Sequence, residues 1–280
     1  MIASMTVFGT IGLFVRMISV SSAELALYRA VIAAGMLTGY FLISRTSIRL
    51  ENKQELPLLL LSGAAMGFNW ILLFEAYKYT TVSIATLSYY FAPVIVTVAC
   101  PLLFKEKMGP MQWLCFAMST LGLTLITGIG DLSGGSSHLT GIAFGLGAAV
   151  LYASVMLLNK RIRGVSGLQR TYWQFLAAIA VVLPYVLCTS GFTLHTLDGR
   201  GWVMLLIVGA VHTGLSYCLY FPSLKALPGQ ETAILSYIDP LLACVLSVTL
   251  LGETMTPVQL LGGALILGFT LLNELSPRRK

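Results

Sequence analysis

Long apolar runs recur along this 280-residue chain, and they constrain its fold more than any other feature. Each run has roughly 20 residues, enough for a helix to cross about 30 Å of hydrocarbon. Only 10% of the residues are charged, whereas a soluble domain averages about 25%. The alternating segments of about ten residues that a membrane β-barrel needs are absent from the sequence. We therefore predict an all-α polytopic membrane protein.

Ten apolar spans joined by short connections can be drawn along the sequence. Their expected bounds are 2–19, 23–43, 55–76, 81–103, 110–128, 139–159, 170–189, 201–222, 230–251 and 257–275. The longest connection, from Gly128 to His138, is rich in glycine and serine, which predicts a linker between two halves. We expect one transmembrane domain with a first unit at 1–128, a linker at 129–138, a second unit at 139–275 and a basic tail at 276–280.

Basic residues gather on one side of this arrangement. With the N-terminus in the cytoplasm, 13 of the 17 lysines and arginines fall in inside loops or in the tail. These are Arg45, Arg49, Lys53, Lys105, Lys107, Lys160, Arg161, Arg163, Arg170, Lys225, Arg278, Arg279 and Lys280. Such a bias is typical of cytoplasmic loops. It predicts that both termini are cytoplasmic, and it explains the net charge of +6 without a nucleic-acid partner.

A sequence repeat relates the two halves. When the second half is shifted back by 147 residues, it overlays the first without a gap over about fifty positions. The matched pairs are Gly67 with Gly214, Phe74 with Phe221, Lys78 with Lys225, Tyr90 with Tyr237, Pro93 with Pro240, Glu106 with Glu253, Pro110 with Pro257 and Gln112 with Gln259. Each half has an odd number of spans, five, so the second half should be inverted in the membrane. Two inverted five-helix repeats are a known transporter architecture.

Three stretches resemble a known family. DPLLACVLSVTLLGETMTPVQLLGGALILGFTLL, which begins at Asp239, is similar to the signature of the EamA-type drug/metabolite transporter superfamily. APVIVTVACPLLFKEKMGPMQW, from Ala92, resembles its weaker first copy, and ELALYRAVIAA, from Glu24, resembles the family's second span. Within the family the chain most resembles the YddG-type bacterial aromatic amino-acid exporters. The resemblance implies a ten-span inner-membrane carrier that exports small metabolites by alternating access.

Two prolines indicate where a binding site should lie. Pro93 and Pro240 fall near the middle of the fourth and ninth spans and are matched by the repeat. Proline has no N–H and interrupts a helix, and paired interruptions in the two halves point to a midplane site. Kinks that serve only helix packing are the alternative.

Asp239 is the only acidic residue expected near the bilayer centre. A charge there costs roughly 3 kcal/mol or more, so Asp239 should face a wet cavity, pair with a cation or stay protonated. Arg29 is a candidate charge partner, unless its side chain extends outward to the membrane surface. The family often has glutamate at the position of Asp239, so the carboxylate here has a shorter reach. His212, in the eighth span, is either a proton relay or a hydrogen-bonded packing residue.

Aromatic side chains with polar groups occur in mid-span positions. They suit a pocket for amphipathic solutes, because the ring stacks on the solute while the polar group binds an amine or carboxylate; ordinary helix packing is the alternative. Ser236 shares a helical face with Asp239. The expected substrate site is therefore Trp70, Tyr89, Tyr90, Tyr152, His212, Tyr217, Ser236, Tyr237 and Asp239.

These features favour a secondary carrier for small amphipathic metabolites, most directly amino acids including aromatic ones. Export of other metabolites or of toxic organic cations is the alternative, and both proton coupling and passive facilitation stay open. An intramembrane enzyme is disfavoured because the sequence has no H-E-x-x-H and no G-x-S-x-G. The sequence also has no P-loop, so we expect that no ATPase on this chain drives transport. We expect no cofactor and no metal, a small-molecule substrate and the lipid bilayer as partners, and a monomer. The five cysteines lie in apolar runs, which predicts packing residues.

Overall fold

The computed structural model describes residues 1–46, 48, 50, 53–104, 108–127, 135–162, 164–227 and 234–276. These residues form helices and no strand. The long helices are α1 (Ile2–Val15), α2 (Ser22–Ser44), α3 (Leu56–Tyr79), α4 (Val82–Tyr89), α5 (Ala92–Phe104), α6 (Pro110–Thr127), α7 (Gly135–Arg161), α8 (Gly167–Cys188), α9 (Gly199–Ile207), α10 (Ser216–Ala226), α12 (Ile238–Thr249) and α13 (Pro257–Leu275). Between them lie the short 3-10 helices η1 (Lys53–Glu55) and η3 (Leu194–Thr196) and the π-helix η4 (Val208–Leu215). Residues 129–134 of the expected linker and 277–280 of the tail lie outside this part of the chain, and the rest of the linker belongs to α7.

The helices have the length and composition of membrane spans. Within the part of the chain that the structure describes, seven helical segments are long and apolar enough to cross a bilayer: Ser22–Ser44, Lys53–Tyr79, Val82–Leu103, Ser137–Arg161, Gly167–Cys188, Gly199–Ser223 and Pro257–Leu275. Three shorter apolar helices are Ile2–Val15, Pro110–Ile126 and Ile234–Thr249. Many large apolar side chains lie on the outside, such as Ile43 at 87% exposure and Leu102 at 80%. Such a surface suits lipid rather than water, as expected of a polytopic membrane protein.

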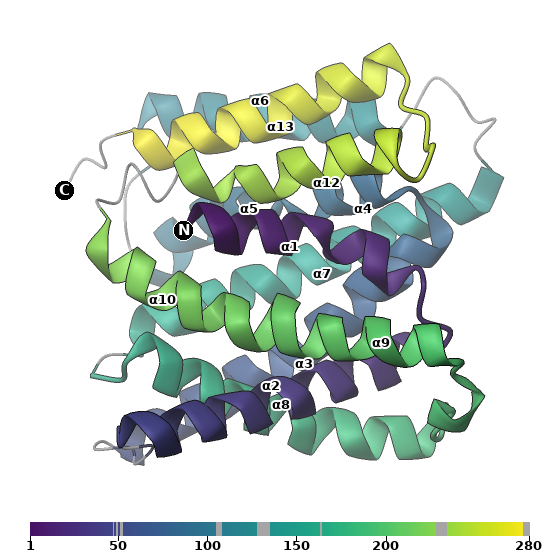
Figure 1. The fold of residues 1–280 in the computed structure, drawn as a ribbon. Coiled ribbons are helices and arrows are strands. Elements are labelled where there is room, and N and C mark those ends of the chain that lie inside the picture. The colour runs from purple at the N-terminus through teal and green to yellow at the C-terminus, as the bar shows by residue number, and fades with distance from the viewer. Residues whose placement is uncertain are drawn as a thin grey trace.

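The two halves of the chain pack into each other. α1 lies between α12 and α10, two helices of the C-terminal half (Figure 1). α2 packs on α8 and η4, while α3 packs on α7 and α8. The first three long helices therefore bury their surfaces mainly on the second half.

Local sequence signals start several helices. In a capping box, the N-cap side chain and the side chain three residues later each bind the other's backbone N–H. α2, α8 and α13 all begin in this way, and α3 and α13 also carry a proline in their first turn. The three boxes are Ser21 with Glu24, Ser166 with Gln169 and Thr256 with Gln259.

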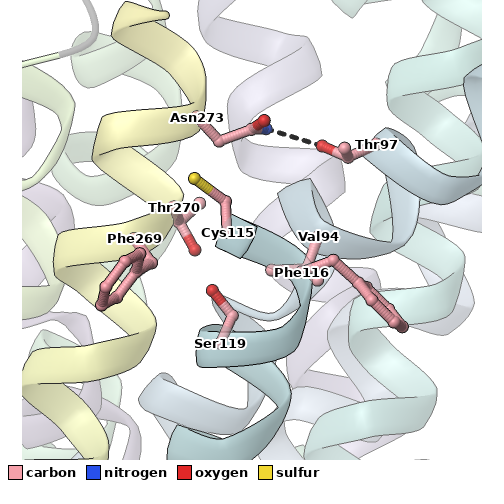
Figure 2. Close-up of a pocket in the computed structure, with 8 residues that line it drawn as sticks. All are labelled: Val94, Thr97, Cys115, Phe116, Ser119, Phe269, Thr270 and Asn273. Carbon is pink, nitrogen blue, oxygen red and sulfur yellow. Dashed lines mark hydrogen bonds between the residues drawn. The ribbon is translucent and has the colours of Figure 1, made fainter. Parts of the chain in front are cut away.

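α6 and α13 form a close antiparallel pair. A Cβ atom added to Gly122 would lie 2.6 Å from the carbonyl oxygen of Gly262, and one added to Gly262 would lie 2.6 Å from the carbonyl oxygen of Gly122. Figure 2 shows a narrow pocket farther along this pair, where the two helices run in opposite directions and Asn273 donates to Thr97 at 2.7 Å. The pocket is too narrow to admit a water molecule, and none of the expected site residues lines it.

The contact between these glycines predicts a large stability effect from a small change. Gly262→Ala should destabilise the protein by about 1–3 kcal/mol, because the new methyl group overlaps a backbone oxygen that a neighbouring helix holds in place. Gly268→Ala, on the same helix, has nothing within 4 Å of the new atom and should be neutral or slightly stabilising. Thermal unfolding of the purified variants in detergent measures both. Equal melting temperatures for the two variants would contradict the close helix contact.

The π-helix η4 sets the position of α2. Within it, Thr213 donates to the carbonyl of Val208, five residues earlier, at 2.9 Å, as the wider π turn requires. Gly209 lies against Ile32, and a Cβ atom at Gly209 would approach that side chain to 2.6 Å. The absence of a side chain at Gly209 lets α2 approach η4 closely, and this brings Arg29 next to Thr213.

Candidate substrate site

The helix of the fourth expected span is interrupted. α4 and α5 are separated by a turn at Tyr90 and Phe91. Pro93 is the second residue of α5, a position at which a helix does not need the missing N–H. The interruption thus falls just before the proline, and the proline itself starts the next helix.

A second interruption occurs at the matched place in the other half. Residues 234–236 are helical and end at the half-buried Ser236, Tyr237 forms a turn, and α12 follows with Pro240 as its third residue. Tyr90 and Tyr237, which the 147-residue shift matches, have ring centroids 6.5 Å apart. The two interruptions therefore meet inside the bundle.

Asp239 lies at the second interruption, as the second residue of α12. Its carboxylate accepts a hydrogen bond of 2.6 Å from the hydroxyl of Tyr90. Its backbone packs against α1, where a Cβ atom at Gly9 would lie 2.7 Å from the carbonyl oxygen of Asp239. The N-terminus of α12 favours a negative charge at this position. The residue as a whole is half-buried.

Arg29 provides the opposite charge. It is 4% exposed, its Nε donates to Thr213 Oγ1 at 3.1 Å, and its Cζ lies 4.2 Å from the ring centroid of Trp70 and 5.4 Å from that of Phe74. Among the ion pairs found in the described residues, none involves Arg29. The expected direct pair with Asp239 is thus not formed in this structure, and Arg29 does not extend to the membrane surface either.

Arg29 and Asp239 do not pair because each charge contacts another side chain. The guanidinium gains a cation–π contact with Trp70, and the carboxylate is held by Tyr90. Both charges therefore keep unused hydrogen-bonding capacity: Arg29 has further N–H donors and Asp239 has a second oxygen.

One group of aromatic rings surrounds the interruptions. Tyr89 and Tyr152 are stacked with centroids 5.1 Å apart, and Tyr89 and Tyr90 meet edge to face at 6.0 Å. Tyr89 is the last residue of α4, Tyr90 lies in the turn that follows, and Tyr152 is on α7. These rings join the pair of Tyr90 and Tyr237 described above. Four of the expected site residues thus form one continuous aromatic wall.

A second group lies beside Arg29. Trp70 and Tyr217 both pack on Phe175, with centroids 5.7 and 5.6 Å away, and Tyr217 also meets Phe8 at 5.5 Å. Phe8 and Phe175 were not among the expected site residues. Both side chains are apolar, so a search for aromatic residues with polar groups does not select them. They belong to this second group through packing alone.

The two groups share one neighbourhood. Tyr89 and Tyr217 are each close enough to both Arg29 and Asp239 for electrostatic interaction. Tyr152 is 39% exposed, and Tyr89 and Tyr217 are only partly buried. Tyr89 and Tyr217, which keep some exposed surface, therefore lie near both a cation and an anion.

His212 is placed differently from the other expected residues. It is 2% exposed; its Nε2 lies 2.8 Å from Thr10 Oγ1, and its Nδ1 lies 3.3 Å from the carbonyl of Ile207. Its ring packs on Phe14, with centroids 4.7 Å apart. Both ring nitrogens have partners on α1 or on the preceding helix, a geometry that fits the packing alternative.

These features define a class of protein. Apolar helices, a pair of helix interruptions and a polar site between two halves are typical of secondary membrane transporters. Residues 1–128 and 139–274 each match the sequence model of the EamA-like transporter family. The chain therefore belongs to this family, and its relatives' names point to transport rather than to an enzyme activity.

The relatives cover most of the chain. An uncharacterized transporter, YxxF, of Bacillus subtilis is 30% identical over 273 residues, which are 95% of this chain and 85% of the relative. The threonine/homoserine exporter RhtA of Escherichia coli is 27% identical over 237 residues, 83% of this chain and 76% of the relative. A solved structure titled "Crystal structure of protein" superposes with a TM-score of 0.67 at 17% identity, covering 96% of this chain and 94% of that one; this likeness concerns the fold.

Proposed function

We propose that this chain is a bacterial inner-membrane carrier that exports amino acids. The observation that carries the proposal is the placement of Arg29 and Asp239 around one set of polar rings. An amino acid carries a carboxylate, which a guanidinium binds well, and an ammonium group, which a carboxylate binds well. The site offers one partner for each group, and the rings offer a surface for the side chain.

Two substrate types are supported by different observations. The stacked tyrosines and Trp70 favour aromatic amino acids, because a planar side chain gains contact area on such a wall. The name of the relative RhtA favours threonine and homoserine. Both types share the head group that Arg29 and Asp239 would hold, so the proposal fixes the head group and leaves two candidate side chains.

Counterflow in proteoliposomes tests this function. Vesicles loaded with one unlabelled amino acid should accumulate the labelled form transiently, with phenylalanine, tyrosine, tryptophan, threonine and homoserine compared side by side. We expect exchange with at least one of these five amino acids. We also expect a clear preference either for the three aromatic amino acids or for threonine and homoserine. Repeating the assay with and without a pH gradient separates proton coupling from facilitated exchange. Vesicles that exchange none of the five would reject the proposal.

We further propose alternating access between two inverted five-helix repeats, ten spans in all. The meeting of Tyr90 and Tyr237, which the repeat matches, supports a twofold relation between the halves. The reciprocal contact of Gly122 and Gly262 in the antiparallel pair of α6 and α13 supports the same relation. In such an architecture the two halves rock around a fixed midplane site.

The proposed topology predicts a definite labelling pattern. In a cysteine-free background, Lys53→Cys should react with an impermeant thiol reagent only from the cytoplasmic side, and Thr196→Cys only from the outer side. Both positions are exposed, so neither reaction requires unfolding. The C-terminal tail provides a second cytoplasmic reporter. An outer tail would contradict both the inverted repeat and the orientation taken from the basic loops.

A further inference from the structure

A cavity separate from the candidate site lies where α1 ends, α2 begins and α3 ends. It has a volume of about 380 Å³ and is lined in part by Arg16, Ser22, Leu25, Phe74, Tyr77 and Lys78. The proposed topology places it on the outer face. Its lining combines two cations with aromatic and aliphatic side chains, and none of the expected site residues belongs to it.

Arg16 is held at the edge of this cavity. Its Nη2 donates to the carbonyls of Tyr77 and Thr80 at 3.0 and 2.8 Å, and its Nη1 forms an ion pair of 2.7 Å with Glu253. These contacts fix the orientation of the guanidinium. The side chain is nevertheless 34% exposed, so part of it faces the cavity.

Glu253 joins the two halves at this face. It lies between α12 and α13, accepts a hydrogen bond of 2.8 Å from the backbone N–H of Val82 at the start of α4, and also binds Ser247. A carboxylate at a helix N-terminus is a favourable cap. Glu253 therefore keeps its place even when Arg16 takes another partner.

The cavity edge carries charges of both signs. Arg16 pairs with Glu253, and Lys78 pairs with Glu75 at 3.0 Å. The cations Arg16 and Lys78 line the cavity, and their carboxylate partners lie next to it. A solute carboxylate can therefore meet a cation of the lining, while an ammonium group on the same solute lies near the carboxylates. This arrangement favours a zwitterion.

Phe74 separates this cavity from the candidate site. Its ring is 1% exposed and lines the cavity, and it also lies 5.4 Å from Arg29. Tyr77, another lining residue, is close enough to both Arg29 and Arg16 for electrostatic interaction. Phe74 and Tyr77 thus connect Arg29, at the candidate site, with the cavity that Arg16 lines.

We propose that the cavity is a second binding site for a zwitterionic amino acid, in which Arg16 binds the carboxylate after the solute passes Phe74. The identity of the solute rests on the proposed function. The carboxylate competes with Glu253 for the guanidinium, so Arg16 exchanges one ion pair for another and no covalent bond changes. The cavity is then the last site before release to the outer face.

Counterflow with phenylalanine, or with the best-exchanged of the five amino acids, tests the site. The half-saturating concentration is measured separately on the outer and the inner face of the membrane. Arg16→Gln should raise the half-saturating concentration on the outer face roughly tenfold, as expected for the loss of one hydrogen bond to a charged group, and change the inner value less than about twofold. Glu253→Gln breaks the same ion pair but keeps Arg16, and should leave the outer value unchanged or lower it. Arg200→Gln, an exposed arginine of the same face outside the cavity lining, is the matched control.

Equal increases for Arg16→Gln and Glu253→Gln would overturn the proposal, since Arg16 would then act only by joining the halves. So would an unchanged outer value for Arg16→Gln. A second measurement does not depend on folding of that variant or on transport. Val20→Cys, at the cavity lining, is placed in a protein whose exposed Cys188 is serine. Saturating phenylalanine or threonine should slow its modification by an impermeant thiol reagent, whereas unchanged rates with both reject the site even where the vesicles exchange amino acids.

Discussion

Arg29→Gln is expected to lower amino-acid counterflow by about 100-fold or more, while the protein melts at the same temperature or higher. Two hydrogen bonds from a guanidinium to a carboxylate contribute about 3 kcal/mol or more, and this corresponds to at least about 100-fold in binding. The guanidinium is buried without an ion-pair partner among the described residues. Removing an unmatched buried charge relieves a desolvation penalty, so stability should not fall.

The control for this prediction is Arg29→Lys. It keeps the charge but loses the planar pair of donors that fits a carboxylate, so we expect an intermediate loss of counterflow. Thermal unfolding in detergent and counterflow are measured on the same preparations. A variant Arg29→Gln that loses stability and activity together would show that Arg29 is mainly structural, through Thr213 and Trp70.

Asp239→Asn is expected to have the second large effect. The amide keeps the size of the side chain, and its oxygen still accepts the hydrogen bond from Tyr90, so folding should be retained. The negative charge that would hold an ammonium group is lost, and amino-acid counterflow should fall about 100-fold. Exchange of a deaminated analogue, which has no ammonium group, should fall much less.

Other roles of Asp239 predict other outcomes. Tyr90→Phe removes the hydrogen bond but keeps the charge, and should reduce counterflow less than Asp239→Asn does. If Asp239 instead served as a structural partner of Arg29, the double change Arg29→Gln with Asp239→Asn would be more stable than Asp239→Asn alone, by roughly 3–5 kcal/mol. If it carried a coupling proton, exchange would survive while accumulation driven by a pH gradient would disappear. Normal stability with normal transport in Asp239→Asn would contradict all of these roles.

The sequence predicts helix bounds well where proline or capping residues flank an apolar run. The expected span 257–275 has the bounds of α13, and 110–128 extends one residue beyond α6. A proline in the first turn marks both starts, and a capping Thr256 also precedes α13. Bounds are less accurate inside apolar sequence: the span expected at 2–19 ends as a helix at Val15, because hydropathy does not distinguish a helix from an apolar turn.

The sequence predicts which polar and aromatic residues lie inside the bundle, but it does not predict their direct partners. Arg29 and Asp239 have opposite charge at similar depth, which made a direct pair plausible. Whether they meet depends on how each helix is rotated about its axis, and hydropathy leaves that rotation undefined. Thr213 was missed for a related reason, since the π-helix at Val208–Leu215 adds a residue to the turn and shifts every following side chain around the helix.

The repeat also indicates Phe74, which is not among the expected site residues. The repeat matches it with Phe221, and both rings lie at the site: Phe74 beside Arg29, and Phe221 stacked on Tyr217 at 5.8 Å. A matched pair of large aromatic residues in the two halves is therefore as informative as a matched pair of prolines.

The most direct test of the central claim is whether the carrier requires both charges of the amino-acid head group. Proteoliposomes that contain the wild-type protein would be loaded with phenylalanine, phenethylamine or 3-phenylpropionate, and uptake of labelled phenylalanine would be followed. We expect phenylalanine to drive counterflow and each singly charged analogue to be at least about tenfold weaker, because Arg29 and Asp239 each lose a partner. Should either analogue drive counterflow as well as phenylalanine does, the two charges do not hold the two ends of the solute, and the proposed site is wrong.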